Sequence, residues 1–183
     1  MIVLARHGRP NVNLNEWIAA REIADWIRDY DMGGIFAEEA PAGSRAKAAE
    51  CGLIVSSPLV RCMESAKALA ASREISSDAA FREAGLPYAP WGLPRFPVAV
   101  WTTLFRIAWF LGFSVNSESR TAAAARARTA AIRLIDLARA HGSVFMMGHG
   151  IMNALIGKEL IRSGWAGPKR PSHRYWQFGV YRK

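Results

Sequence analysis

The chain has 183 residues, of which 51% are apolar, and its formal net charge is +9. That length suits one α/β domain rather than two, and the apolar content excludes disorder as the main state. Lysine and arginine outnumber aspartate and glutamate by 24 to 15, so we expect an anionic partner, for which the planar guanidinium of arginine is well suited.

The first quarter of the chain opens with a short apolar run at residues 2–5, which predicts a buried parallel strand that leads into a loop. A helix is expected from Asn15 and is expected to end at Gly33. The positions that share its apolar face, spaced i, i+3, i+4 and i+7, are Ile23, Trp26, Ile27 and Tyr30. Residues 37–49 are expected to be a polar connection with a short helix.

A second buried strand is predicted at residues 53–55. Ser57 suits the N-cap of the following helix and Pro58 its first position, which puts Arg61 in the first helical turn. Residues 75–81 are expected to form a third strand at an edge of the sheet.

The second half starts with a loop at residues 87–97, which four prolines interrupt. A strand is predicted at 144–147, and the tail, 164–183, is expected to add one more. The helices expected in this half are 101–113, 121–140 and 151–161.

Strands that alternate with helices predict an α/β fold, a three-layer α/β/α sandwich with a mostly parallel sheet. Ligands of such folds bind beyond the carboxyl ends of the strands. Four residues fall just past predicted strand ends, so we expect them on one rim of the sheet: Arg6, His7, Arg61 and His149.

Two histidines and two arginines on one rim would make a cationic pocket for a phosphate dianion. Helix N-termini near Arg61 and His149 would add free N–H groups and partial positive charge. A neutral imidazole is a competent nucleophile toward phosphorus, and arginines stabilise the transferring group. No Asp, Glu or His cluster has metal-ligand spacing, so neither a metal nor a cofactor is expected.

Four blocks of this sequence resemble, in order, the signature of the histidine phosphatase superfamily, which includes the cofactor-dependent phosphoglycerate mutases. The blocks are Leu4–Gly8 with Asn13, Ser56–Arg61 followed by Ser65–Ala66, Phe81–Glu83, and Met147–Gly150. The resemblance implies that residues 1–183 form a single histidine phosphatase domain with the phosphoglycerate mutase-like fold.

The resemblance also implies the role of each residue. His7 would attack phosphorus and form a phosphohistidine, and Glu83 would protonate the leaving oxygen and later activate water. The phosphoryl oxygens would be held by Arg6, Arg61 and His149, with further hydrogen bonds from Asn13 and the Gly150 N–H.

The sequence departs from the family pattern at Arg9-Pro10, where many members have an acidic residue followed by Ser or Thr, and after Glu83. These departures leave the substrate open. We expect a metal-independent phosphomonoester phosphatase. The alternatives are a phosphoglycerate mutase-like phosphotransferase and a non-catalytic protein that binds a phosphate ligand, although the complete set of motif residues argues against the last.

The apolar segment 98–113 has three candidate roles: core packing, a wall of the substrate pocket, or a homodimer contact. The tail from Lys158 to Lys183 has seven basic residues and one acidic residue among aromatics. Base stacking on this tail is an alternative, but packing of its aromatics is the simpler interpretation, so no nucleic acid is expected.

Cys51 and Cys62, eleven positions apart, form neither a C-x-x-C pair nor a zinc pattern, which favours a reducing compartment. The most apolar segment spans only sixteen residues and contains Arg106, so no membrane span is expected. Together with the lack of a signal-peptide pattern at Met1, these features predict a cytoplasmic protein.

Overall fold

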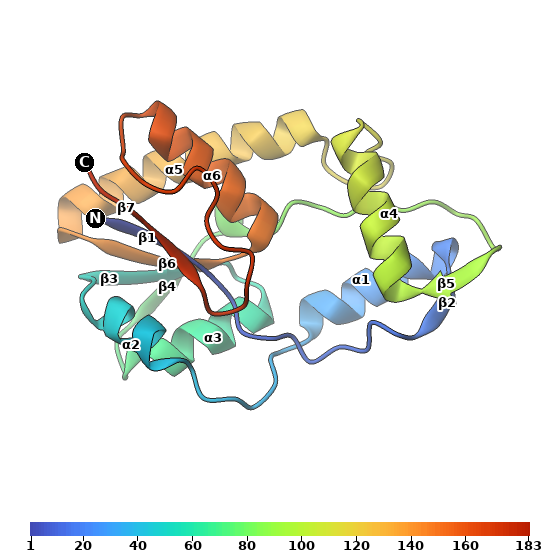
Figure 1. The fold of residues 1–183 in the computed structure, drawn as a ribbon, viewed down its shortest axis with the longest axis horizontal. Coiled ribbons are helices and arrows are strands. Elements are labelled where there is room, and N and C mark those ends of the chain that lie inside the picture. Colours follow the sequence, from blue (N-terminus) through green and yellow to red (C-terminus); the bar gives the residue numbers. More distant parts are fainter.

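A five-stranded sheet lies at the centre of the computed structural model, which describes residues 1–183 (Figure 1). The strands follow the order β4-β3-β6-β1-β7 across the sheet. All neighbours are parallel except β7, which runs antiparallel to β1. The strands are β1 (Ile2–Arg6), β3 (Leu53–Ser56), β4 (Ile75–Ser77), β6 (Val144–Gly148) and β7 (Phe178–Tyr181).

Helices cover both faces of the sheet, because residues along β1 and β6 alternate between two apolar clusters. One face packs against α5 (Arg120–His141) and α6 (Gly150–Arg162). The other packs against α3 (Val60–Ala70), with α2 (Ala42–Ala49) beside it (Figure 1). This three-layer α/β/α arrangement confirms the predicted fold class.

The strand order brings the three strands that carry the sequence motifs side by side. Arg6 pairs with Gly148 in the β1–β6 register, and Ser56 pairs with Met147 in the β3–β6 register. The chain therefore leaves all three strands at the same edge of the sheet. We call this edge the rim and define it as residues 6–8, 57–61 and 149–150.

A second group of elements lies beyond the rim (Figure 1). We call it the roof; it comprises β2 (Trp17–Ala19), α1 (Ile23–Met32), β5 (Arg95–Pro97) and α4 (Val98–Phe110). β2 and β5 form an antiparallel pair. An apolar cluster of its own holds the roof together, with Ile18, Ile23, Val98, Trp101 and Phe105 at its centre.

The roof is where the sequence predictions were least accurate. The helix expected from Asn15 begins only at Ile23, because β2 and a 3₁₀ turn precede it. β5 lies within the stretch predicted as a proline-rich loop, and the helix expected at 101–113 is α4, which begins at Val98 and ends at Phe110. Pairing with β2, which is distant in sequence, makes the short β5 a strand.

Two smaller predictions around the sheet were also wrong. The helix expected to begin at Pro58 begins at Val60, with Leu59 at its N-cap. The strand expected at 75–81 ends at Ser77, because the Asp78 side chain accepts the N–H of Ala80 and starts a 3₁₀ turn. β7 confirms the expected strand in the tail. No helix is both long enough and apolar enough to span a membrane.

Candidate active site

The rim brings Arg6, His7, Arg61 and His149 together. His7 follows β1 directly, and its ring lies 5.2 Å from the ring of His149, which follows β6. Arg61, in the first turn of α3, and Arg6 both lie near enough to His7 to disfavour its protonation. Three of these side chains are almost completely buried: His7, Arg61 and His149.

Hydrogen bonding fixes the tautomer of His7. Its Nδ1 lies 2.7 Å from the carbonyl oxygen of Gly8, so Nδ1 donates and Nε2 has the free lone pair. The pKa of His7 is lowered to about 3, mainly by burial, with a smaller contribution from the nearby arginines and against the opposing effect of the Gly8 bond. The imidazole is therefore neutral near pH 7, as a nucleophile must be.

His149 sits at the N-cap of α6 in a fully buried pocket. Its Nε2 lies 2.9 Å from the Ser57 hydroxyl and 3.3 Å from the Cys62 sulfur. Burial holds the pKa of His149 well below its ordinary value, with Arg61 as a further cause. Ser57, expected to be a helix N-cap, thus contacts the second histidine of the site. The sequence signal for this contact was the position of Ser57 directly after β3, on the rim.

Each rim arginine has an aromatic ring stacked on its guanidinium. Arg61 lies 4.1 Å from the centre of the Tyr30 ring, and Arg6 lies 4.3 Å from that of Tyr175. Arg61 also donates to the Tyr30 carbonyl and to Asp31. The Nε atoms of both arginines are buried without a hydrogen-bond partner. Buried unpaired N–H groups of this kind suit an anion.

Glu83 lies at the N-terminus of α6. Its carboxylate accepts N–H groups from Ile151 at 3.3 Å and from Met152 at 2.9 Å. These N–H groups have no carbonyl partner within the helix, so the Glu83 oxygens satisfy them. The Gly150 N–H, one position earlier, has no carbonyl within the helix to receive it, and Gly150 lies against Arg6.

Two arginines hold the segment that carries Glu83. Arg126 of α5 donates to the carbonyls of Ala80, Arg82 and Glu83 and pairs with Glu118. Arg106 of α4 donates to the next two carbonyls, those of Ala84 and Gly85. Glu118 in turn accepts the Gly85 N–H. The backbone around Glu83 is therefore fixed by side chains from two helices distant in sequence.

Close packing explains the glycine after His7. A Cβ on Gly8 would lie 2.5 Å from the Trp176 ring, so only glycine fits there. The backbone N–H of Gly8 donates to the Ser65 hydroxyl, and the backbone N–H of Trp176 donates to the carbonyl of Arg6. The tail, which the sequence motifs did not include, thus holds the loop that carries His7.

Asn13 is the one predicted site residue that does not reach this cluster. Its side chain is exposed and accepts the N–H of Asn15, which forms a local turn. Val12 and Leu14, on either side, line the neighbouring cavity, whereas Asn13 does not.

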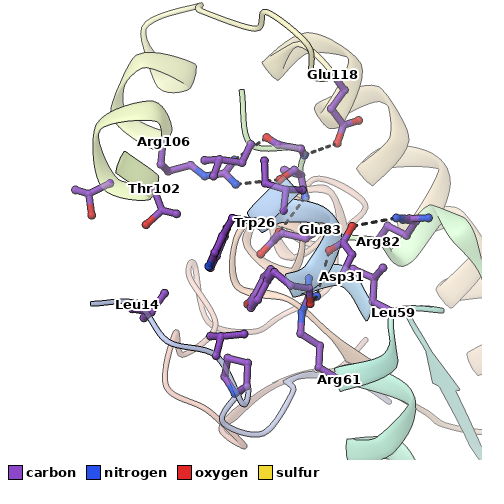
Figure 2. A pocket seen from close by; sticks show the side chains of 18 of the residues that line it. Leu14, Trp26, Asp31, Leu59, Arg61, Arg82, Glu83, Thr102, Arg106 and Glu118 are labelled. Atoms are coloured by element: carbon purple, nitrogen blue, oxygen red, sulfur yellow. Dashed lines mark hydrogen bonds and ion pairs between the residues drawn. The ribbon is translucent and has the colours of Figure 1, made fainter. Parts of the chain in front are cut away.

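A cavity of about 770 Å³ lies between the rim and the roof. Figure 2 shows Arg61, Asp31 and Arg82 at one end and Thr102 and Arg106 of α4 at the other. Neither imidazole lines this cavity. Arg61 and Tyr175 do line it, and the Tyr175 ring is 5.7 Å from the His7 ring. We call the two ends the Arg61 end and the far end.

The helix α4, which makes up most of segment 98–113, both packs in the core and lines the cavity. Trp101, Phe105 and Trp109 belong to the core, each at most 4% exposed. Ile107 and Phe110, on another side of the helix, line the cavity. Core packing and a pocket wall therefore belong to different faces of one helix.

The arrangement can bind a phosphoryl group, offer it a neutral nucleophilic nitrogen and place a carboxylate nearby. No three His, Cys, Asp or Glu side chains lie together as a metal site. Tyr30, Asp31 and Tyr175 border the site but were not predicted to, because no local pattern indicates that α1 and the tail reach the rim.

Solved structures of other proteins share this fold. A mycobacterial glucosyl-3-phosphoglycerate phosphatase is 23% identical, covers 88% of this chain and 79% of its own, and has a TM-score of 0.58. A structure described as mycobacterial hydrolase 1 is 20% identical; the match covers 88% of this chain and 78% of that chain, with a TM-score of 0.61. An Entamoeba histolytica phosphoserine phosphatase mutant, in complex with phosphoserine, is 15% identical. The match covers 100% of this chain and 94% of that chain, with a TM-score of 0.59.

These identities establish likeness of fold alone, and no curated protein matches the chain. The model of the histidine phosphatase superfamily, branch 1, matches residues 2–178. That match includes every strand of the rim and the loops that carry His7 and His149. The chain therefore belongs to branch 1 of the histidine phosphatase superfamily.

Proposed function

We propose that this protein is a metal-independent phosphatase that hydrolyses a phosphomonoester through a phosphohistidine on His7. In the first step the His7 Nε2 bonds to phosphorus, the bond from phosphorus to the ester oxygen breaks, and Glu83 gives that oxygen its proton. In the second step water bonds to phosphorus as Glu83 takes a proton from it. The N–P bond then breaks, which releases inorganic phosphate and restores neutral His7.

The state of His7 is the observation that carries this proposal. Its Nδ1–H is committed to Gly8, and its pKa is lowered to about 3, so Nε2 is free to attack at neutral pH. Two guanidinium groups with buried, unpaired Nε atoms lie beside it and suit the equatorial oxygens of a transferring phosphoryl group. His149 and the Gly150 N–H complete the proposed cradle, and Glu83, which lines the cavity, faces the leaving group.

The proposal also covers the cellular location, the substrate class and the oligomeric state of the protein. Cys51 and Cys62 are both free thiols, which supports a reducing, cytoplasmic location. We propose that residues 1–183 act as one domain on a small anionic phosphorylated substrate without nucleic acid. A homodimer stays a prediction, which light scattering of the purified protein tests.

The test uses purified protein, 4-nitrophenyl phosphate and excess EDTA. We expect hydrolysis to persist in EDTA, and quenching with denaturant at alkaline pH to trap a phosphoenzyme that is stable in base and labile in acid. His7→Gln should lower kcat by about 10⁴-fold or more, as removal of a nucleophile does, and should abolish the phosphoenzyme. His141→Gln, in an exposed histidine outside the site, is the matched control.

Three outcomes contradict the proposal or part of it. Binding of inorganic phosphate without turnover would favour the non-catalytic alternative. Transfer of the phosphoryl group to an added alcohol in preference to water would favour the phosphotransferase. Activity that EDTA removes and a divalent metal restores would exclude the metal-independent mechanism.

A further inference from the structure

The cavity beside the rim is far larger than a phosphoryl group. Its volume, about 770 Å³, lies in the range of sites for whole organic ligands. Resting on the proposed phosphatase function, we propose that the substrate is the phosphomonoester of a bulky, apolar, ring-bearing alcohol. The alcohol part lies at the far end, between α1 and α4.

Twelve of the 23 residues that line the cavity are apolar. Six large ones come from the loop after β1, from α1, from the segment after Glu83 and from α4: Leu14, Trp26, Ile27, Leu86, Ile107 and Phe110. Ile107 is 53% exposed and Phe110 is 44% exposed. Apolar surface that faces water inside a concave site is stabilised when an apolar ligand covers it.

The polar groups at the far end already have partners within the protein. The hydroxyls of Thr102 and Thr103 both donate to the Ala99 carbonyl of their own helix, at 3.2 and 2.7 Å. Arg106 turns both terminal nitrogens to backbone carbonyls at 3.0 and 3.1 Å. A sugar or a carboxylic acid would give up hydrogen bonds to water here and find few donors in exchange.

An aromatic stack connects the two ends of the cavity. The rings of Trp26 and Tyr30 are 4.9 Å apart and nearly parallel, and Tyr30 in turn stacks on Arg61. Figure 2 shows Trp26 between the Arg61 end and the Arg106 end. A flat ring attached to a phosphoryl group at Arg61 would lie against Trp26, where ring–ring contact adds to the gain from burial.

The first test compares primary-alkyl phosphates whose leaving oxygens are chemically alike: ethyl phosphate, 2-(1-naphthyl)ethyl phosphate and glucose 6-phosphate. We expect kcat/KM for the naphthylethyl ester to exceed that for ethyl phosphate by about 10–100-fold, the discrimination that apolar pockets achieve. Glucose 6-phosphate should do no better than ethyl phosphate. A kcat/KM for glucose 6-phosphate that equals or exceeds that of the naphthylethyl ester would overturn the inference.

The second test assigns the preference to the cavity. Ile107→Ser should lower the naphthylethyl-to-ethyl ratio of kcat/KM by about tenfold. Leu104→Ser is the matched control, because Leu104 is an exposed apolar residue of the same helix that does not line the cavity. It should leave the ratio unchanged. Equal ratios in all three proteins would overturn the inference.

The third test separates this inference from the proposed function. Calorimetry measures binding of 2-(1-naphthyl)ethylphosphonate and ethylphosphonate, which cannot be hydrolysed. If no ester is turned over but the naphthyl compound binds more tightly, the phosphatase proposal fails and the apolar cavity stands as a binding site. If esters are turned over but the two phosphonates bind equally, the phosphatase proposal stands and the apolar substrate is excluded.

Discussion

The rim and the roof differ in how their residues are held. At the rim, short motifs directly after parallel strands converge, and buried hydrogen bonds fix side chains such as His7 and His149. In the roof, elements distant in sequence pack through their own apolar cluster, and several cavity-facing side chains stay exposed. Within the proposed function we assign the chemistry to the rim and the choice of substrate to the roof, as in many folds where loops and added segments set specificity.

Among the substitutions that test this difference between rim and roof, Glu83→Gln is expected to have the largest effect. The amide that replaces the carboxylate keeps an acceptor for the N–H groups of α6 but cannot act as a general acid. We expect kcat/KM for alkyl phosphates to fall by about 10²–10⁴-fold, and that for 4-nitrophenyl phosphate to fall much less, because its leaving group needs no proton. Glu16→Gln, at an exposed carboxylate away from the cavity, is the control. Equal losses on both ester classes would remove Glu83 from the acid role.

The buried histidines of the rim should make the stability of the protein depend on pH. The pKa of His7 is about 3 when folded and near 6.5 when unfolded, so between these values the unfolded chain binds more protons. The free energy of unfolding should therefore fall as pH drops from 6.5 toward 3, by up to about 1.4 kcal/mol per pH unit for His7. His149, whose pKa is also lowered, acts in the same direction.

Urea unfolding at pH 6.5 and 4.5 measures this dependence. His7→Gln should show a shallower fall than the wild type, and His141→Gln, at an exposed histidine, should match the wild type. If all three proteins lost the same free energy, buried neutral His7 would not be a source of acid sensitivity.

A smaller effect is expected where α5 supports the segment that carries Glu83. Arg126→Lys keeps a charge beside Glu118 but removes the fork that reaches the carbonyls of Arg82 and Glu83. Misplacement of Glu83 should lower kcat for alkyl phosphates by about tenfold and spare aryl phosphates. Arg128→Lys, at an exposed arginine of the same helix, is the control. A loss shared equally by both ester classes would indicate a purely structural role for Arg126.

The smallest effect is expected at Asn13, which the motif resemblance assigned to the substrate. Its side chain is exposed and bonded to Asn15, so Asn13→Ala should change kcat/KM by no more than about twofold, as surface substitutions do. A tenfold loss, measured with the same esters, would show that the loop after β1 brings Asn13 to the substrate. It would contradict the assignment of separate roles to the rim and the roof.

Much of the sheet could be predicted from the sequence, because its signals are local. Continuous apolar runs mark β1, β3 and β6 as strands buried on both faces, and parallel strands direct their carboxyl ends to one edge. The same reasoning placed Arg6, His7, Arg61 and His149 on one rim. Element boundaries were less accurate: the Ser57 hydroxyl, for example, bonds to His149, and α3 begins at Val60 with Leu59 at its N-cap.

Only the tertiary structure decided the strands of the roof and the support of the segment that carries Glu83. β2 and β5 are three residues each, too short for periodicity to indicate a strand, and they become strands by pairing with each other although they are distant in sequence. The contacts of Tyr30 and Tyr175 with the rim arginines, and those of Arg126 with the segment that carries Glu83, likewise depend on long-range packing. The sequence by itself determined which chemical groups meet at the sheet edge, since each follows its own strand. The shape and lining of the cavity depend on contacts between distant segments, which no local pattern encodes.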